Sequence, residues 1–245
     1  MKKFKILITG SSRGIGFAIA KKLSANKNNL IYINGRNKND LNKAKKKINN
    51  CEAILGDLTN EKTLKKISKK IKFLDVLICN IGSGKSSAEG REKKKDWEKS
   101  FKINFYSALD VIKIFEKKLI KSKGKIICIS SICGLEYIRG APIPYSVSKA
   151  ALNTFVRSYS KFLGTKGVKI NAVAPGNILF KGSTWEKKIK KDRKKTLNFI
   201  KNEVPMKTFG SEKGIANLVN YLVEDQSNFI NGSIFVADGG QIKSF

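Results

Sequence analysis

The stretch that decides the fold is Lys5-Ile-Leu-Ile-Thr-Gly10-Ser-Ser-Arg-Gly14-Ile-Gly16, close to the amino terminus. It begins with a short apolar run typical of a buried strand, turns through glycines, and leads into residues 15–23, where apolar side chains recur at helical spacing. Glycines let a backbone turn sharply and approach a pyrophosphate closely, and the N-terminus of a helix offers that anion free N–H groups. The stretch therefore predicts a dinucleotide-binding loop between a first strand and a first helix, with a plain tight turn as the alternative.

Apolar runs alternate with helical segments along the rest of the chain. They predict further strands at 30–33, 53–55, 74–78, 125–129, 168–173 and 233–236, and helices at 40–48, 61–71, 96–120 and 145–163. Continuous Val, Ile and Leu strands separated by helices favour a parallel sheet that is covered on both faces. We therefore expect an α/β fold, a Rossmann-like doubly wound parallel sheet of seven strands with helices on both faces.

The chain of 245 residues is long enough for one large domain, and it contains no linker or internal repeat. We expect residues 1–245 to form a single dinucleotide-binding domain. The segment 177–203 interrupts the alternation of predicted strands and helices, and it contains Trp185 and a lysine-rich helical stretch. An excursion after a late strand is placed where ligands bind in such folds, so we expect 177–203 to act as a lid over the substrate.

The formal net charge is +31, and most of the excess is lysine spread from Lys2 to Lys243. A basic surface can attract nucleic acid or a membrane, but specific nucleic-acid readers favour arginine for bidentate contacts. Abundant lysine and asparagine together favour compositional drift, so we do not expect a nucleic-acid partner. An acidic partner such as an acyl carrier protein stays compatible with the charge.

No apolar run reaches the length of about 18 residues that a membrane-spanning helix needs. The apolar run near the amino terminus is also too short for a signal peptide, and it leads into the glycine loop without a cleavage-like site. We therefore expect a cytoplasmic protein with no membrane partner.

The chain has four cysteines without a Cys-x-x-Cys pair and has no histidine, so we expect no metal site. Cys79 and Cys128 lie in apolar strand-like runs, where buried thiols are expected. The lack of histidine also excludes Ser-His and Cys-His nucleophilic mechanisms. Acid–base chemistry must come from Tyr, Lys, Asp or Glu.

The acid–base candidates stand in Tyr145-Ser-Val-Ser-Lys149, where the phenol and the amine are four residues apart on one helical face. A nearby ammonium favours the phenolate, so we expect Lys149 to lower the pKa of Tyr145 from about 10. Ser131, fourteen residues upstream, is placed to hold a substrate oxygen beside the phenol. The alternative is a core aromatic and a solvated amine that share a spacing by chance.

The end of the second predicted strand indicates which dinucleotide binds. An acidic residue there would bind the ribose 2′-hydroxyl of NAD, but the sequence is Asn34-Gly35-Arg36. Arg13 and Arg36 suit a 2′-phosphate instead, which favours NADP(H) over NAD(H), unless both are solvated surface side chains. Asp57, after the third strand, is placed to meet the adenine.

These motifs together make the chain resemble a short-chain dehydrogenase/reductase over nearly its full length. Within that family it is most similar to 3-oxoacyl-[acyl-carrier-protein] reductases. The motifs are Thr9 to Gly16, Asp57-Leu58, Asn80-Ile81-Gly82, Asn104, Ile129-Ser-Ser131, Tyr145 to Lys149, Asn171, Pro175-Gly176 and Asp238-Gly-Gly240, with similarity also at 204–209 and 230–232.

The resemblance implies a catalytic tetrad of Asn104, Ser131, Tyr145 and Lys149. Tyr145 would protonate the carbonyl oxygen as hydride arrives, Ser131 would orient that oxygen, Lys149 would bind the nicotinamide ribose, and Asn104 would hold a water that resupplies protons. Ser130 is the rival for the serine role; the position of Gly134 favours Ser131.

The resemblance also implies the cofactor contacts and a homotetramer. Asn80 should lie near the adenine-side ribose, and the backbone of Ile178 should meet the carboxamide. The implied cofactor-binding set is Gly10, Ser12, Arg13, Gly14, Ile15, Gly16, Arg36, Asp57, Leu58, Asn80, Gly82, Tyr145, Lys149, Pro175, Gly176 and Ile178. The chain departs from the family at Ile81, where alanine is usual, and near Phe180, where a threonine is usual.

The sequence thus favours an NADP(H)-dependent oxidoreductase that reduces a carbonyl to a secondary alcohol or catalyses the reverse. A carbonyl or alcohol linked to acyl carrier protein is one expected substrate. One alternative is an NAD-linked dehydrogenase of a sugar or polyol. Another is a non-catalytic protein that senses a nucleotide or binds nucleic acid on the same fold.

Overall fold

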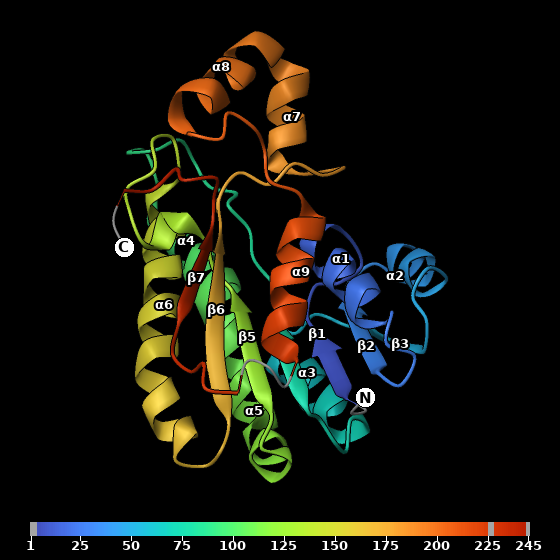
Figure 1. Ribbon diagram of the computed structural model, residues 1–245. Coiled ribbons are helices and arrows are strands. Elements are labelled where there is room, and N and C mark those ends of the chain that lie inside the picture. The colour runs from blue at the N-terminus through green and yellow to red at the C-terminus, as the bar shows by residue number, and fades with distance from the viewer. Residues whose placement is uncertain (1–3, 225–227, 244–245) are drawn as a thin grey trace.

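The computed structural model describes residues 4–224 and 228–243. Seven strands form one parallel sheet in the order β3-β2-β1-β4-β5-β6-β7 (Figure 1). The strands are β1 (Lys5–Ile8), β2 (Leu30–Gly35), β3 (Cys51–Leu55), β4 (Val76–Cys79), β5 (Lys125–Ile129), β6 (Lys169–Pro175) and β7 (Ile234–Ala237). The sheet order reverses between β1 and β4, as in a doubly wound Rossmann-like fold, and this confirms the predicted fold class.

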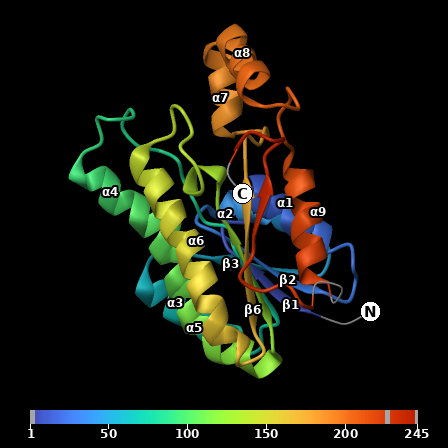
Figure 2. The same cartoon turned by 60° about the vertical axis from the view of Figure 1, so that its left-hand side comes forward.

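Helices cover both faces of the sheet (Figure 2). One face packs against α1 (Gly14–Leu23), α2 (Lys38–Lys45) and α9 (Glu212–Val223), and the other against α3 (Glu61–Lys70), α5 (Ser107–Ser122) and α6 (Ile143–Gly164). Successive side chains of a strand point to opposite faces. In β1, for example, Ile6 and Ile8 join the core beneath α1, while Leu7 joins the core beneath α5.

The structure differs from the predicted elements at two places in the chain after β4. The helix predicted at 96–120 is divided into α4 (Lys94–Phe101), a π-helical turn η1 (Lys102–Tyr106) and α5. The helix α9 was not predicted, although its buried Ile215, Val219 and Leu222 recur at helical spacing. π-helical turns are uncommon and occur often at functional sites.

The segment 177–203 contains two helices, α7 (Thr184–Lys191) and α8 (Arg193–Glu203). Figure 1 shows both helices standing beyond the carboxyl ends of the strands, above the rest of the molecule. The segment is therefore placed where the sequence predicts a lid.

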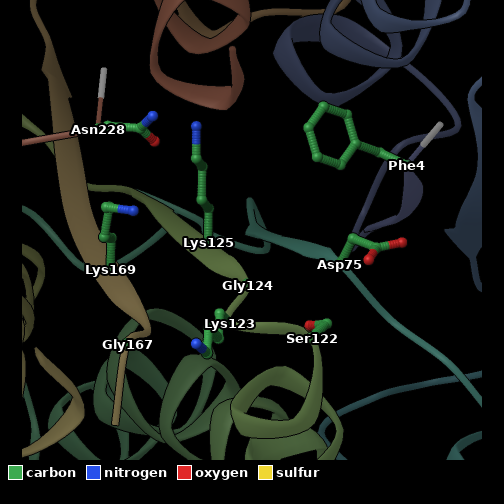
Figure 3. A pocket seen from close by; sticks show the side chains of 9 residues that line it. All are labelled: Phe4, Asp75, Ser122, Lys123, Gly124, Lys125, Gly167, Lys169 and Asn228. Atoms are coloured by element: carbon green, nitrogen blue, oxygen red, sulfur yellow. The ribbon is translucent and has the colours of Figure 1, made fainter. Parts of the chain in front are cut away.

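A hollow of about 340 Å³ lies at the opposite, amino-terminal ends of the strands (Figure 3). Its buried lysine, Lys125, donates hydrogen bonds from Nζ to the carbonyl oxygens of Val223 and Glu224. These carbonyls end α9, where a cation is favoured by the helix dipole. Lys125 thus stabilises the end of α9. Within the part of the chain that the structure describes, no helix is long and apolar enough to span a membrane.

Candidate active site

A cleft of about 840 Å³ opens at the carboxyl ends of the strands. The predicted site residues come together there from segments far apart in the sequence. The cleft is lined by Gly10, Ser12, Arg13, Gly14, Ile15, Arg36, Asp57, Leu58, Asn80, Gly82, Ser131, Tyr145, Lys149, Pro175, Gly176 and Ile178. Two predicted site residues, Gly16 and Asn104, are buried behind its wall.

The glycine loop has the backbone conformation that its sequence predicts. Gly10 and Gly14 adopt φ values of +62° and +57°, a region that L side chains rarely enter. At position 16 glycine is required for a steric reason, because an added Cβ would lie 2.4 Å from Nδ2 of Asn80. That amide donates to the carbonyl oxygens of Thr9 and Gly10 at 3.0 and 2.9 Å, and so joins the end of β4 to the loop.

The loop ends in the first turn of α1, which has the properties of an anion site. The backbone of Arg13 is extended just before Gly14, and none of the side chains that the structure describes caps the free N–H groups of the turn. No acidic side chain lies in that first turn either. Uncapped N–H groups and the positive end of the helix dipole together favour a phosphate at this place.

A residue that we did not single out, Asn34, supports the loop from β2. It is buried; its Oδ1 accepts a hydrogen bond from the Gly10 amide at 3.2 Å, and its Nδ2 donates to the carbonyl oxygens of Ile54 and Gly56. The sequence signal that could have identified Asn34 is a polar residue at the end of an otherwise apolar strand.

Arg36 and Asp57 meet at the rim of the cleft. Their side chains form an exposed ion pair with Nη1 and Oδ2 3.5 Å apart. Burial raises the pKa of Asp57, but hydrogen bonds from Thr59 and the charge of Arg36 outweigh it and leave that pKa below its usual value. Exposed pairs of this kind are weak, so Arg36 can exchange its partner for another anion at small cost.

Lys149 lies at the inner end of the cleft and is 2% exposed. Its Nζ donates a hydrogen bond to the carbonyl oxygen of Ile129 at 2.8 Å. Burial lowers the pKa of Lys149 to about 8, against small opposing effects of nearby thiols. The amine is therefore poised to change its protonation near neutral pH.

The pKa of Tyr145 differs from the sequence prediction. Burial raises it above its usual value, with a smaller opposing effect from a hydrogen bond with Ser131, and Lys149 is not among the groups that shift it. The prediction that Lys149 lowers this pKa is therefore wrong for the structure described, because desolvation of the phenol dominates. The phenol keeps its proton at neutral pH.

Two serines at the end of β5 were rivals for the position beside Tyr145. Ser131 interacts with the phenol, and its Oγ accepts a hydrogen bond from the amide of Cys133 at 3.2 Å. Ser130 also lines the cleft, and its buried Oγ has no partner among the described residues. The contact with Tyr145 favours Ser131.

Asn104 approaches Lys149 from behind the cleft wall. A Cβ added at Gly82 would lie 3.2 Å from Oδ1 of Asn104 and 3.4 Å from Nζ of Lys149. Glycine at position 82 thus lets the amide and the ammonium come close together. Asn104 is in the π-helical turn η1, where backbone hydrogen bonding departs from the regular α pattern.

The segment 177–203, which the sequence predicts to be a lid, contributes aromatic residues to the cleft. Phe180 and Trp185 line the cleft, and the ring of Phe180 packs on Gly14 of the glycine loop. The ring of Trp185 stacks on Phe199 with centroids 5.5 Å apart and contacts Phe209 at the same distance. These contacts pack α7 against α8 and hold the start of the segment 177–203 beside the glycine loop.

Known proteins resemble the chain over almost its whole length. A family model described as enoyl-(acyl carrier protein) reductase matches residues 10–241. The chain is 33% identical to a 3-oxoacyl-[acyl-carrier-protein] reductase FabG of Rickettsia felis, over 96% of this chain and 95% of that protein. It is 30% identical to a glucose 1-dehydrogenase of Gluconobacter oxydans, over 96% and 91% of the two chains.

A solved structure agrees with these sequence relatives. The crystal structure of YwfH, described as an NADPH-dependent reductase involved in bacilysin biosynthesis, superposes with a TM-score of 0.92 at 27% identity and covers all of both chains. With the parallel sheet, the glycine loop and the Tyr145–Lys149 pair in one cleft, the chain belongs to the short-chain dehydrogenase/reductase family of oxidoreductases.

Proposed function

We propose that the protein uses NADP(H) to reduce a carbonyl to a secondary alcohol, or to catalyse the reverse reaction. One observation carries the proposal: Tyr145, Lys149 and Ser131 line the same cleft as the glycine loop. An acid–base group and a dinucleotide-binding loop in one cleft are the two requirements of hydride transfer to a carbonyl.

The residues that line the cleft suit the pyrophosphate and the 2′-phosphate of NADP(H). Gly10 and Gly14 give the loop its left-handed turns, and the first turn of α1 has uncapped N–H groups for the pyrophosphate. Arg36 and Arg13 line the cleft and suit a 2′-phosphate. Structural relatives are described as NADPH-dependent or as complexes with NADP, which supports the same preference. When bound, the nicotinamide supplies or accepts the hydride.

The protein's own residues handle the proton. Tyr145 holds its proton at neutral pH, because burial raises its pKa, and donates it to the substrate oxygen as negative charge develops there. Ser131 orients that oxygen by a hydrogen bond. When the cofactor is bound, Lys149, with a pKa of about 8, would hold the nicotinamide ribose and resupply a proton to Tyr145, and Asn104 in η1 would hold a water that connects Lys149 to solvent.

Acyl chains carried by acyl carrier protein are the first substrates to consider, because the relatives at 33% identity are described as reductases of such substrates. Lys85, Lys99, Lys102 and Lys187 line the cleft, and among the described residues that line it Asp57 is the one carboxylate. A positive mouth raises the local concentration of an anionic substrate or an acidic carrier.

The second candidate function is an NAD-linked dehydrogenase of a sugar or polyol, and the glucose 1-dehydrogenase relative favours it. A panel of carbonyl substrates, assayed by absorbance with NADPH and in parallel with NADH, tests the proposal and separates the two candidates. The proposal expects turnover of a ketone or 3-oxoacyl thioester with NADPH at a rate well above that with NADH. Preference for NAD with a polyol would favour the second candidate.

A non-catalytic nucleotide sensor or nucleic-acid binder remains the alternative from another class. Its signature is tight NADPH binding without turnover of any carbonyl in the panel, or nucleic-acid binding that survives physiological salt. Binding that disappears as salt rises would reflect the general positive charge alone.

We also propose a homotetramer. Its support is an aromatic row along α6 in which the rings of Phe155, Tyr159 and Phe162 stack with centroids 4.9 and 5.3 Å apart. Phe162 and Tyr106 are 44% and 49% exposed, so a partner helix pair would cover apolar surface there. Sedimentation of the wild type and of Phe162→Asp tests this face: the proposal expects a smaller species for the variant.

A further inference from the structure

Two buried serines lie side by side behind the cleft. Ser100 in α4 is 5% exposed and Ser148 in α6 is fully buried, and their hydroxyl oxygens are 3.1 Å apart. The two residues are far apart in sequence, so this bond joins two helices. Neither serine lines the cleft, and neither belongs to the predicted tetrad.

The neighbours of the pair fix the direction of its hydrogen bonds. Ser148 donates its only hydroxyl proton to the carbonyl oxygen of Tyr145 at 2.8 Å. Ser100 must then donate to Ser148. The Oγ of Ser100 in turn accepts a hydrogen bond from Nδ2 of Asn104 at 3.1 Å. The result is a one-directional chain from Asn104 through Ser100 and Ser148 to the backbone of Tyr145.

The other end of this chain reaches the loop after β4. Oδ1 of Asn104 accepts from the amide of Ser83 at 2.8 Å, and its Nδ2 also donates to the carbonyl oxygen of Ser83 at 3.0 Å. Ser83 lines the cleft and follows Gly82, which lies against Asn104 and Lys149. One buried network therefore connects the cleft wall, the turn η1 and the helix that carries Tyr145 and Lys149.

Such a network gives the two helices one relative position. A buried hydroxyl that loses its partner costs free energy, so every register of α4 against α6 that breaks the chain is disfavoured. We infer that the Ser100–Ser148 pair is a positioning device, which holds Asn104 and the loop at Ser83 in register with Tyr145 and Lys149. The inference rests on the proposed function, because it concerns the alignment of those groups during reduction.

The test compares Ser100→Ala, Ser148→Ala and the double variant in steady-state reduction with NADPH. Misplaced catalytic groups lower the rate of the chemical step more than they weaken binding, so each single variant should lose about tenfold in kcat with little change in KM. Both serines act through one bond, so the double variant should also lose about tenfold, well short of the about 100-fold that independent effects would give. Ser100→Thr keeps a hydroxyl and should recover most of the rate.

Ser160→Ala is the matched control. Ser160 is a buried serine of the same helix, and its Oγ donates to the carbonyl oxygen of Arg157, three residues back, as Ser148 does to Tyr145. It has no link to Asn104, so kcat should stay near the wild-type value. Thermal unfolding and NADPH binding of all variants are measured in parallel to show that they are folded.

Three results would overturn the inference: a loss of kcat in Ser160→Ala equal to that in Ser148→Ala, additive losses in the double variant, or unchanged kcat in both single variants. If the wild type turns over no carbonyl at all, the proposed function fails first, and that outcome is distinguishable because NADPH binding is measured independently.

Discussion

The ring of Phe180 lies directly on Gly14. A Cβ added at Gly14 would be 2.6 Å from Cε2 of that ring, closer than real Cβ contacts come. Gly14 also has a φ of +57°, so the position requires glycine for two independent reasons. The family resemblance leads one to expect a threonine near position 180; in this chain Phe180 instead joins the start of the segment 177–203 to the glycine loop by apolar packing.

The variant Gly14→Ala should therefore distort the loop. The left-handed backbone costs about 1–2 kcal/mol for an L residue, and the contact with the ring adds to that cost. We expect NADPH affinity to fall by about tenfold or more, measured by fluorescence titration. The double variant Gly14→Ala/Phe180→Ala removes the clash but not the backbone strain, so it should recover part of the affinity. Unchanged affinity in Gly14→Ala would argue against dinucleotide binding at this loop.

Arg36 should determine the choice of cofactor. The variant Arg36→Asp replaces the cation with a carboxylate that repels a 2′-phosphate and can accept hydrogen bonds from a ribose diol. We expect the ratio of kcat/KM for NADPH to that for NADH to fall by about 100-fold. Lys38→Asp, an exposed charge reversal two residues away and outside the cleft lining, is the control for general electrostatics. An equal change of this ratio in both variants would contradict a specific role of Arg36 in the choice of cofactor.

The buried amine of Lys149 should make stability depend on pH. Its folded pKa of about 8 lies below the ordinary value of 10.5, so between these values the unfolded chain binds more protons than the folded one. Stability due to this group must then rise with pH, by about 2 kcal/mol between about pH 7 and about pH 9.5. The raised pKa of Tyr145 acts in the opposite direction, but only above its ordinary value of 10.0.

Urea unfolding of the wild type and of Lys149→Met over this pH range isolates the effect. The variant loses the bond to Ile129, which lowers its stability by a similar amount at every pH. The free energy of unfolding of the wild type should therefore rise relative to that of the variant as pH increases. Parallel curves would mean that Lys149 is charged in the folded protein throughout the range.

The sheet was predictable from the sequence because each strand is a short apolar run bounded by polar turns. The predicted strands 5–8 and 125–129 coincide with β1 and β5, and the glycine loop lies where its motif places it. These features depend on local residue types. The cleft follows from topology, since parallel strands bring their carboxyl ends to one edge.

Other features depend on contacts between distant segments and were missed. The turn η1 interrupts the predicted helix 96–120 where Asn104 forms hydrogen bonds with Ser83. The local sequence pattern does not indicate that Ser83 is the partner of Asn104. The pKa of Tyr145 was predicted in the wrong direction, because the spacing to Lys149 reveals proximity along a helix but not the burial of the phenol. The contact between Phe180 and Gly14 likewise depends on the path of the segment 177–203, which brings Phe180 back to the glycine loop.

The central claim is that Tyr145 donates the proton during carbonyl reduction, and single-turnover reduction with pre-bound NADPH tests it most directly. The variant Tyr145→Phe removes one oxygen atom from the site and leaves the aromatic ring. The account predicts an NADPH dissociation constant close to that of the wild type and a rate of hydride transfer that falls by about 1,000-fold or more. A rate within about tenfold of the wild type, with cofactor bound, would contradict it.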